Sequence, residues 1–397
     1  MTMAIAEDLS TPRPQVPIWI LGALTLTGSL AMHIFVPALP TAGASLGVSP
    51  GQMQFAISLY IVGMAVGQLV YGPLSDRFGR RPVLLAALSL YVAAGAVCHF
   101  ATGIGALLTA RLLQALGGCA GLVLGRAILR DTSSSDEIAG RLALLTMIMV
   151  VGPALAPLIG GEIVQHLGWR AIFVVLVVIG LFNIASILWL IPETRPADAP
   201  GGNFLSGVTT LLKIPRFRWL VLGGACATTS MYGVVTAAPF IFERDLHRPA
   251  HEVGPWLAVV VLAVAMGNMA IRATAGRIPW PRLLRAANWL TLLSGLALPL
   301  IVMTVPLTIG LFIAPVFVFC FATGLTSPLA TTAALSIRPD LAGSASGLYG
   351  FSQMVVGAIC TVLAGMGGDP AMAAGLVMAG VAAVAMLAFR MAARLSD

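Results

Sequence analysis

The chain has 397 residues, of which 58% are hydrophobic and only 9% are charged, and its mean hydropathy is +0.97. Because a soluble domain carries about 25% charged residues, this composition argues against a soluble enzyme, and the apolar content excludes a disordered chain. The net charge of +7 is spread in short clusters between apolar runs, which is typical of membrane-protein loops and not of a nucleic-acid surface. We therefore expect an integral membrane protein that lies in a lipid bilayer and binds no nucleic acid.

Residues 1–16 form a polar N-terminal tail. The tail carries Glu7, Asp8 and a single basic residue, Arg13. It therefore lacks the positive start, short apolar run and small-residue cleavage site of a secretory signal. We expect a cytoplasmic tail that is followed directly by an uncleaved membrane-spanning helix.

Twelve apolar runs follow, each long enough to cross a hydrocarbon core of about 30 Å as a helix. The strands of a β-barrel would instead be short segments of alternating polarity. The expected spans cover residues 17–38, 53–72, 82–101, 105–127, 141–164, 169–191, 218–242, 253–274, 284–304, 307–335, 342–365 and 371–390. The sequence thus predicts an all-α integral membrane fold with two six-helix halves, at 17–191 and 218–390.

The loop after the second span, Gly72–Leu84, has the strongest local signal. Asp76 is an acid in a loop rich in arginine, and it is placed where the dipole of a neighbouring helix start would favour it. The glycines of the loop are expected to permit tight turns. Its characteristic residues are Gly72, Asp76, Arg77, Gly79, Arg80 and Arg81. The arginines alone are typical of any cytoplasmic loop, but the whole string resembles the signature loop of the major facilitator superfamily.

Further strings extend this resemblance. The fifth span contains Gly152–Gly161, which is similar to the proline–glycine motif of the antiporter branch of that superfamily. His33–Pro40, Gly168–Arg170 and Ala342–Gly347 are similar to the Bcr/CflA type of drug-resistance transporter. The antiporter motif residues are Gly152, Pro153, Pro157, Gly160 and Gly161. The resemblance implies a central cavity, and efflux of small amphipathic drugs across a bacterial cytoplasmic (inner) membrane, driven by inward proton flow.

Glycines spaced four apart form smooth ridges on several spans, among them Gly63 with Gly67 and Gly117 with Gly121. Such ridges let membrane helices approach closely. Two interpretations are open. The ridges either pack helices statically or let the two halves rock past each other.

Arg111 lies inside the fourth span, and Gln114 follows it on the same helix face. The resemblance implies a role for both residues in proton coupling, with Arg111 tuning the pKa of a neighbour. The alternative is a structural arginine bonded to backbone carbonyls.

His33 departs from the family pattern, because the Bcr/CflA type usually has an aspartate at this point of the first span. A histidine has an unperturbed pKa near 6.5, so it can load and release protons near neutral pH. Three roles are open for His33: the proton site, a hydrogen-bonding group for substrate, or a spectator. No acidic residue falls in the middle of a span, so coupling itself depends on this histidine.

Residues 192–217 form the longest polar break, which we interpret as a cytoplasmic linker between the halves, and 391–397 form a C-terminal tail. A short repeat supports two halves, since Gly79–Pro82 after the second span matches Gly276–Pro279 after the eighth. With the N-terminus inside, only Arg170, Arg244 and Arg248 lie outside. This asymmetry predicts that both termini are cytoplasmic.

The remaining cavity candidates are chosen for polarity or for a flexible thioether, although packing is the commoner role of such residues. They are Gln114, Met147, Met149, Met231, Tyr232, Asn268, Tyr349 and Gln353. The sequence has no nucleotide-binding GxxxxGK[ST] loop and no spacing of metal ligands.

We expect a monomeric, proton-coupled exporter of small hydrophobic or amphipathic compounds that works by alternating access, with no metal and no cofactor beyond the proton gradient. Two alternatives stay open. One is an uncoupled facilitator or importer of a small metabolite, and the other is a non-transporting membrane sensor on the same fold.

Overall fold

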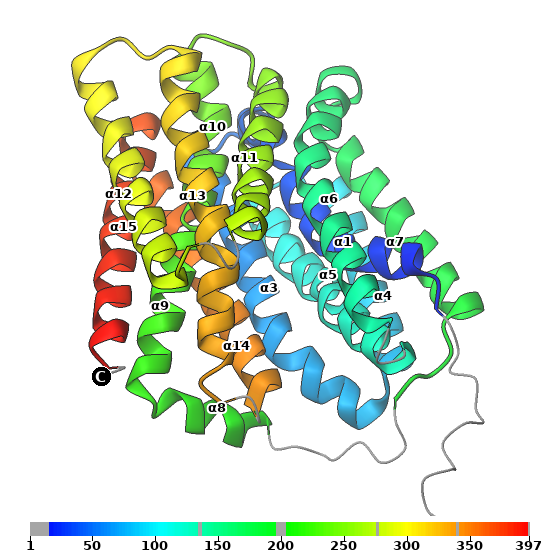
Figure 1. Cartoon of the computed structure of the whole chain (residues 1–397). Helices are drawn as coiled ribbons and strands as arrows, with labels where there is room; N and C mark the ends of the chain where they lie inside the picture. The colour runs from blue at the N-terminus through cyan, green and yellow to red at the C-terminus, as the bar shows by residue number, and fades with distance from the viewer. Residues whose placement is uncertain (1–15, 134–136, 196–203, 275–277, 339–340, 396–397) are drawn as a thin grey trace, which may run out of the picture.

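The computed structural model describes residues 16–133, 137–195, 204–274, 278–338 and 341–395 (Figure 1). These residues form helices and short connections, with no β-strand among them. Twelve segments are long and apolar enough to cross a membrane. The expected all-α membrane fold is therefore confirmed.

The helices follow the expected order, with a few additional breaks. The first half contains α1 (Ile18–His33), η1 (Val36–Ala38), α2 (Leu39–Leu46), α3 (Pro50–Phe78), α4 (Arg80–Phe100), α5 (Ile104–Thr132), α6 (Ile138–Leu167) and α7 (Ala171–Leu190). The remainder contains α8 (Phe204–Leu212), α9 (Pro215–Thr229), α10 (Met231–Arg244), η2 (Ala250–Glu252), α11 (Val253–Thr274), α12 (Trp280–Thr304), α13 (Ile309–Leu335), α14 (Ala342–Gly365) and α15 (Pro370–Arg394).

The two ends of the helix bundle differ in charge. One end carries the turn between α3 and α4, the short helix α8 and the C-terminus, at the bottom of Figure 1, together with most of the described arginines. We call it the basic end, and it is the end that the charge pattern predicts to be cytoplasmic. The opposite end, which carries the turn between α10 and α11, is called the far end.

The first span does not continue as one helix to residue 38. Helix α1 ends at His33, a 3-10 turn follows, and α2 then extends to Leu46. Pro37 and Pro40 explain the break, because proline has no N–H to donate and its ring clashes with the preceding turn. His33 is consequently the last residue of a helix and not a residue within one.

The seventh span is also interrupted, at Ser230, between α9 and α10. The hydroxyls of Thr228 and Thr229 donate to the carbonyls of Gly224 and Ala225, at 2.6 and 2.8 Å. Such bonds to the preceding turn bend helices. The span expected over 218–242 is confirmed as Pro215–Arg244, with this break at Ser230 inside it.

The loop expected after the second span is mostly helical. Helix α3 continues through Gly72, around which a Cβ would meet nothing within 4 Å, and only Gly79 has a positive φ, of 96°. Gly72 thus makes no turn, contrary to expectation, and Gly79 alone makes it. The expected linker is likewise partly helical, since α8 lies within it and α9 begins at Pro215.

The two halves meet along two helix pairs, α3 with α14 and α6 with α11. Backbones approach closely at the far end, where a Cβ on Gly161 would lie 2.9 Å from the carbonyl oxygen of His251. On the other helix pair, α3 with α14, the hydroxyls of Ser58 and Thr361 share a hydrogen bond of 2.6 Å. These contacts hold the far ends of the halves together.

The glycine ridges of the second and fourth spans pack within the first half. A Cβ on Gly63 would lie 2.6 Å from the carbonyl oxygen of Leu112, and one on Gly121 would lie 2.0 Å from that of Leu24. These two glycines therefore hold α3 to α5 and α5 to α1. This placement favours the static interpretation for both ridges.

Candidate functional site

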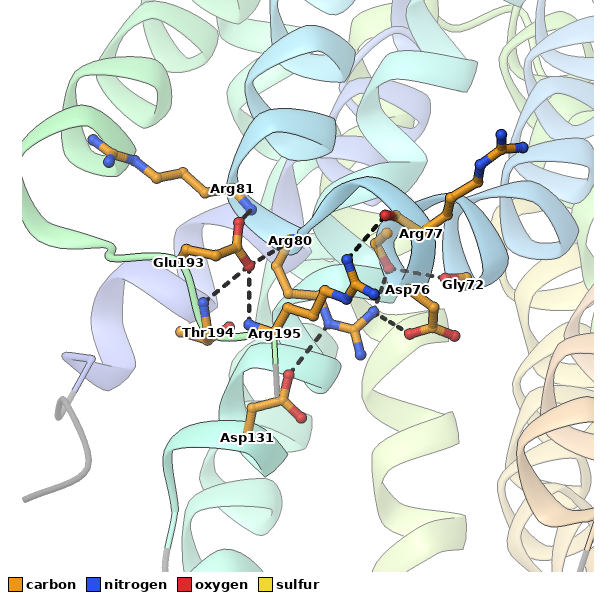
Figure 2. A network of polar contacts seen from close by, with 10 residues as sticks. Gly72, Asp76, Arg77, Arg80, Arg81, Asp131, Glu193, Thr194 and Arg195 are labelled. Atoms are coloured by element: carbon orange, nitrogen blue, oxygen red, sulfur yellow. Dashed lines mark hydrogen bonds and ion pairs between the residues drawn. The ribbon is translucent and has the colours of Figure 1, made fainter. Parts of the chain in front are cut away.

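Arg80 is the centre of a polar network at the basic end (Figure 2). Its Nη1 donates to Ser75 Oγ and to Asp76 Oδ1, both at 2.5 Å, and its Nε donates to Asp131 Oδ2 at 3.2 Å. The Arg80 side chain is 6% exposed and that of Asp131 is 8% exposed, whereas that of Asp76 is 50% exposed. Arg80 therefore joins the start of α4 to the ends of α3 and α5 through one buried and one half-exposed ion pair.

Glu193, just beyond α7, fastens the same turn from the other side (Figure 2). Its carboxylate accepts the backbone N–H groups of Arg80 at 2.8 Å, Arg81 at 3.2 Å, Thr194 at 3.0 Å and Arg195 at 2.9 Å. Partial burial acts to raise the pKa of Glu193, but these four hydrogen bonds outweigh it and lower the pKa. The carboxylate satisfies N–H groups at the start of α4 that have no partner within the helix.

The sequence reasoning missed Glu193. The available signal was an acid directly after the sixth apolar run, before the proline-rich linker. Two arginines strengthen the junction: Arg81 Nη2 donates to the carbonyl of Leu188 at 2.8 Å, and Arg195 Nη1 donates to that of Arg77 at 3.0 Å. The loop arginines therefore hold the chain after α7 against the α3–α4 turn.

A cavity of about 390 Å³ opens at the basic end between the two halves. Its wall includes Gly72 and Asp76 from α3, Arg126 from α5, and Gly343 and Gly347 from α14. Asp76 thus lies across a cavity from the first turn of α14, where the helix dipole favours a carboxylate. The structure therefore brings the signature loop to the junction of the halves.

Arg111 is completely buried in the first half. Its Nη1 donates to the carbonyl of Ala31 at 3.2 Å and to Gln114 Oε1 at 2.8 Å. Its guanidinium carbon lies 4.1 Å from the ring centre of Tyr60 and 5.0 Å from that of Phe35, so aromatic faces compensate part of the charge. Its Nε and Nη2 have no hydrogen-bond partner among the described residues.

His33 lies at the junction of the halves, with 5% of its surface exposed. Its Nδ1 is 2.8 Å from the carbonyl oxygen of Ser29. Since a carbonyl only accepts, Nδ1 carries a hydrogen, and Nε2 is the nitrogen that gains or loses a proton. The His33 ring centre lies 6.1 Å from that of Tyr232 on α10, in the other half.

Two cavity candidates lie near the interrupted seventh span. Gln353 Nε2 donates to Thr228 Oγ1 at 2.7 Å, and the carbonyl of Gln353 accepts from Thr229 Oγ1 at 2.8 Å. Tyr232 packs close to α14, because a Cβ on Gly357 would lie 2.8 Å from its ring. Tyr232 and Gln353 therefore border the break in the seventh span, and Tyr232 reaches His33.

The other cavity candidates are scattered. Met231 is half-buried against the core, Tyr349 is buried beside Gly224, and Asn268 is half-buried on α11. Met147 is 60% exposed, and Met149 Sδ accepts from Arg126 Nη2 at 3.5 Å. Met149 is eleven residues before Gly160 on α6, which is about 16 Å along the helix axis.

The antiporter motif packs α6 against both halves. A Cβ on Gly160 would lie 2.1 Å from the carbonyl oxygen of Ile34, the residue after His33, and one on Gly152 would lie 2.3 Å from Leu26 Cδ2. Gly161 faces the second half through His251. The motif therefore sets how closely α6 approaches the end of α1.

Comparisons with known proteins agree with this architecture. The family model described as Major Facilitator Superfamily matches residues 21–361. Multidrug resistance protein D of Escherichia coli is 30% identical over 361 residues, 86% of each chain, and the bicyclomycin resistance protein homolog of Haemophilus influenzae is 27% identical over 379 residues, 94% of each. The chloramphenicol resistance protein of Pseudomonas aeruginosa is 29% identical over 337 residues, 84% of this chain and 79% of the relative.

A solved structure shares the fold. A bacterial homolog of the human lysosomal transporter Spinster, in an inward-facing and occupied conformation, matches with a TM-score of 0.74 at 14% identity, over 98% of this chain and 97% of that one. At this identity the match carries the fold alone.

Proposed function

Because the chain belongs to the Major Facilitator Superfamily, and is therefore a transporter and not an enzyme, we propose that it exports small hydrophobic or amphipathic compounds in exchange for protons. Relatives named for bicyclomycin, chloramphenicol and multidrug resistance support drug-like substrates. The two six-helix halves alternate access to a site between them. The protein works as a monomer in a bacterial inner membrane, with its basic end in the cytoplasm and no cofactor beyond the proton gradient.

The placement of His33 is the observation that carries this proposal. The ring is buried where α1 ends, and Tyr232 faces it from the other half. A charged group is costly in the membrane interior, so protonation of Nε2 favours an arrangement of the halves that exposes the ring to water. Loss of the proton favours the closed junction described above. Proton binding and the relative position of the halves are thereby linked.

Arg111 acts on this junction through the backbone. It donates to the carbonyl of Ala31, two residues before His33, and stacks on Phe35, two residues after it. It therefore fixes the end of α1 on both sides of the imidazole. Asp76, across the cavity from the first turn of α14, biases the inward–outward balance and not the choice of substrate.

Proton-driven flux of a named drug tests the proposal. Chloramphenicol and bicyclomycin uptake is measured in proteoliposomes under an imposed pH gradient, for the wild type, His33→Gln and His166→Gln. His166 is the matched control because its side chain is 66% exposed at the far end. We expect pH-driven flux to be lost in His33→Gln and kept in His166→Gln, with both variants folded.

The outcomes separate the alternatives. Flux that is insensitive to a protonophore would identify an uncoupled facilitator, and drug binding without flux would identify a sensor. Full pH-driven flux in His33→Gln would remove His33 from the coupling mechanism.

A further inference from the structure

A second cavity, of about 380 Å³, lies at the basic end of the second half, and all of its lining residues belong to that half. It opens where the first turns of α9 and α12 meet the last turns of α15. Each of these helices contributes one arginine: Arg216, Arg285 and Arg390. Since α15 packs against both α9 and α12, the three arginines line one cavity.

The three arginines that line this cavity form no ion pair with an acid among the described residues. Further basic residues described at this end of the half are Lys213, Arg218, Arg282 and Arg394, and no acidic residue is described there. In the first half, by contrast, Arg80 is paired with both Asp76 and Asp131. No carboxylate of the described residues therefore balances the positive charge around the second cavity, and an anionic ligand would be favoured there.

Two unpartnered polar atoms point to the chemistry of that anion. Asn288, which lines the cavity, is 6% exposed, and its Oδ1 has no partner among the described residues. The buried Nε of Arg216 has none either. Because Oδ1 accepts and Nε donates, a complementary ligand carries a hydroxyl beside an anionic oxygen.

The remaining wall is apolar. It is formed mainly by Leu220 of α9, Leu284 of α12, and Met386 and Phe389 of α15, and Trp289 stands at its edge with 50% exposure. Trp289 lies nine residues after the start of α12, about 13 Å along the helix axis, which places it beside the acyl chains and not at the headgroups. The ligand therefore also has an apolar part that continues along the helices.

We propose that this cavity binds the headgroup of a phosphatidylglycerol-type anionic phospholipid, from the leaflet that contacts the basic end. The phosphodiester accepts hydrogen bonds from the three arginines, and a glycerol hydroxyl donates to Asn288 Oδ1. The acyl chains leave past Trp289 into the bilayer. Basic pockets between membrane helices are known to hold such headgroups. The lipid bridges α9, α12 and α15 and is independent of the proton-coupling site.

Native mass spectrometry of the full-length protein in neutral detergent tests the proposal. The protein is titrated with phosphatidylglycerol, with phosphatidylcholine, and with sn-glycerol 3-phosphate as a soluble phosphate. We expect one phosphatidylglycerol to bind on the order of tenfold more tightly than phosphatidylcholine. The double variant Arg285→Gln/Arg390→Gln should lose about 30-fold in phosphatidylglycerol affinity.

Arg218→Gln is the matched control. Arg218 lies two residues after Arg216 on α9, about 200° around the helix, and does not line the cavity. It should keep the wild-type preference. Equal phosphatidylglycerol binding in the wild type and the double variant would overturn the proposal, and so would displacement of the lipid by equimolar sn-glycerol 3-phosphate.

Tryptophan fluorescence locates the bound lipid. Phosphatidylglycerol with brominated acyl chains should quench more strongly than brominated phosphatidylcholine, and Trp289→Phe should remove that difference. A difference that persists in Trp289→Phe would place the lipid elsewhere and overturn the assignment of this cavity.

Discussion

Gly160→Ala is expected to destabilise the protein, because the new methyl group meets only backbone. It would lie 2.1 Å from the carbonyl oxygen of Ile34 and 2.9 Å from the carbonyl carbon. To reach an ordinary van der Waals separation of 3.4 Å, α6 and the end of α1 must move apart by about 1.3 Å. Overpacking of this kind costs about 1–3 kcal/mol, which raises the unfolding equilibrium constant by about 5- to 150-fold.

Thermal unfolding in detergent measures the effect, with Gly380→Ala as the control. Gly380 also lies within a long helix, α15, but a Cβ there meets nothing within 4 Å. Alanine at that position should be neutral or stabilising by about 0.5–1 kcal/mol, because glycine is costly in a helix interior. If Gly160→Ala unfolds at or above the temperature of Gly380→Ala, the close packing of α6 on Ile34 is not a constraint.

Three further changes test the junctions described above. Glu193→Gln removes the carboxylate that accepts four backbone N–H groups, and should cost about 1–2 kcal/mol at neutral pH. The pKa of Glu193 is lower in the folded protein than its ordinary value of 4.5. The contribution of the carboxylate to the free energy of unfolding is therefore fully present above pH 4.5, and it is lost as the pH falls through the pKa of the folded state. The melting temperatures of the wild type and Glu193→Gln should therefore converge in acid, and a constant gap would contradict the assignment. Asp131→Asn breaks the buried ion pair of Arg80 and should cost about 1–2 kcal/mol, because Arg80 keeps Asp76 as a partner, whereas Asp76→Asn breaks a half-exposed one and should cost about 1 kcal/mol or less. Equal melting temperatures for these two variants would show that the buried ion pair with Asp131 is no stronger than the half-exposed ion pair with Asp76. Ser58→Ala removes the hydrogen bond to Thr361 that joins the halves at the far end. The loss of a hydrogen bond worth about 0.5–1.5 kcal/mol should raise the population of the state open at the far end by about 2- to 12-fold. Spin-label distances across that end measure this population. Unchanged distance distributions would show that the bond does not hold the halves together.

The sequence was sufficient for the number of spans, because apolar run length is a local property that the bilayer imposes on each helix separately. It was not sufficient for breaks inside spans. Residues 17–38 stay apolar across Pro37, so composition alone does not reveal that α1 ends at His33. The interruption at Ser230 depends on hydroxyls that bond to their own backbone and to Gln353, far along the chain.

The candidate site was predictable only where motif residues act near their own position in the chain. Arg80 and Asp76 are four residues apart and do pair. Asp131 and Glu193 bind the same turn although they are 51 and 113 residues from Arg80. Contacts between residues so far apart in the chain cannot be predicted from the spacing of residues within a motif. The proximity of His33 to Tyr232 likewise depends on how the halves meet.

The hydrogen bond from the Arg80 backbone to Glu193 has a consequence for biogenesis. The turn after α3 is synthesised early, but its carboxylate partner follows 113 residues later. During translation the α3–α4 turn is therefore held only by partners nearer in the chain until the sixth span has emerged from the ribosome. A nascent chain arrested before Glu193 should leave Gly79–Arg81 more open to proteases than a chain arrested just after it.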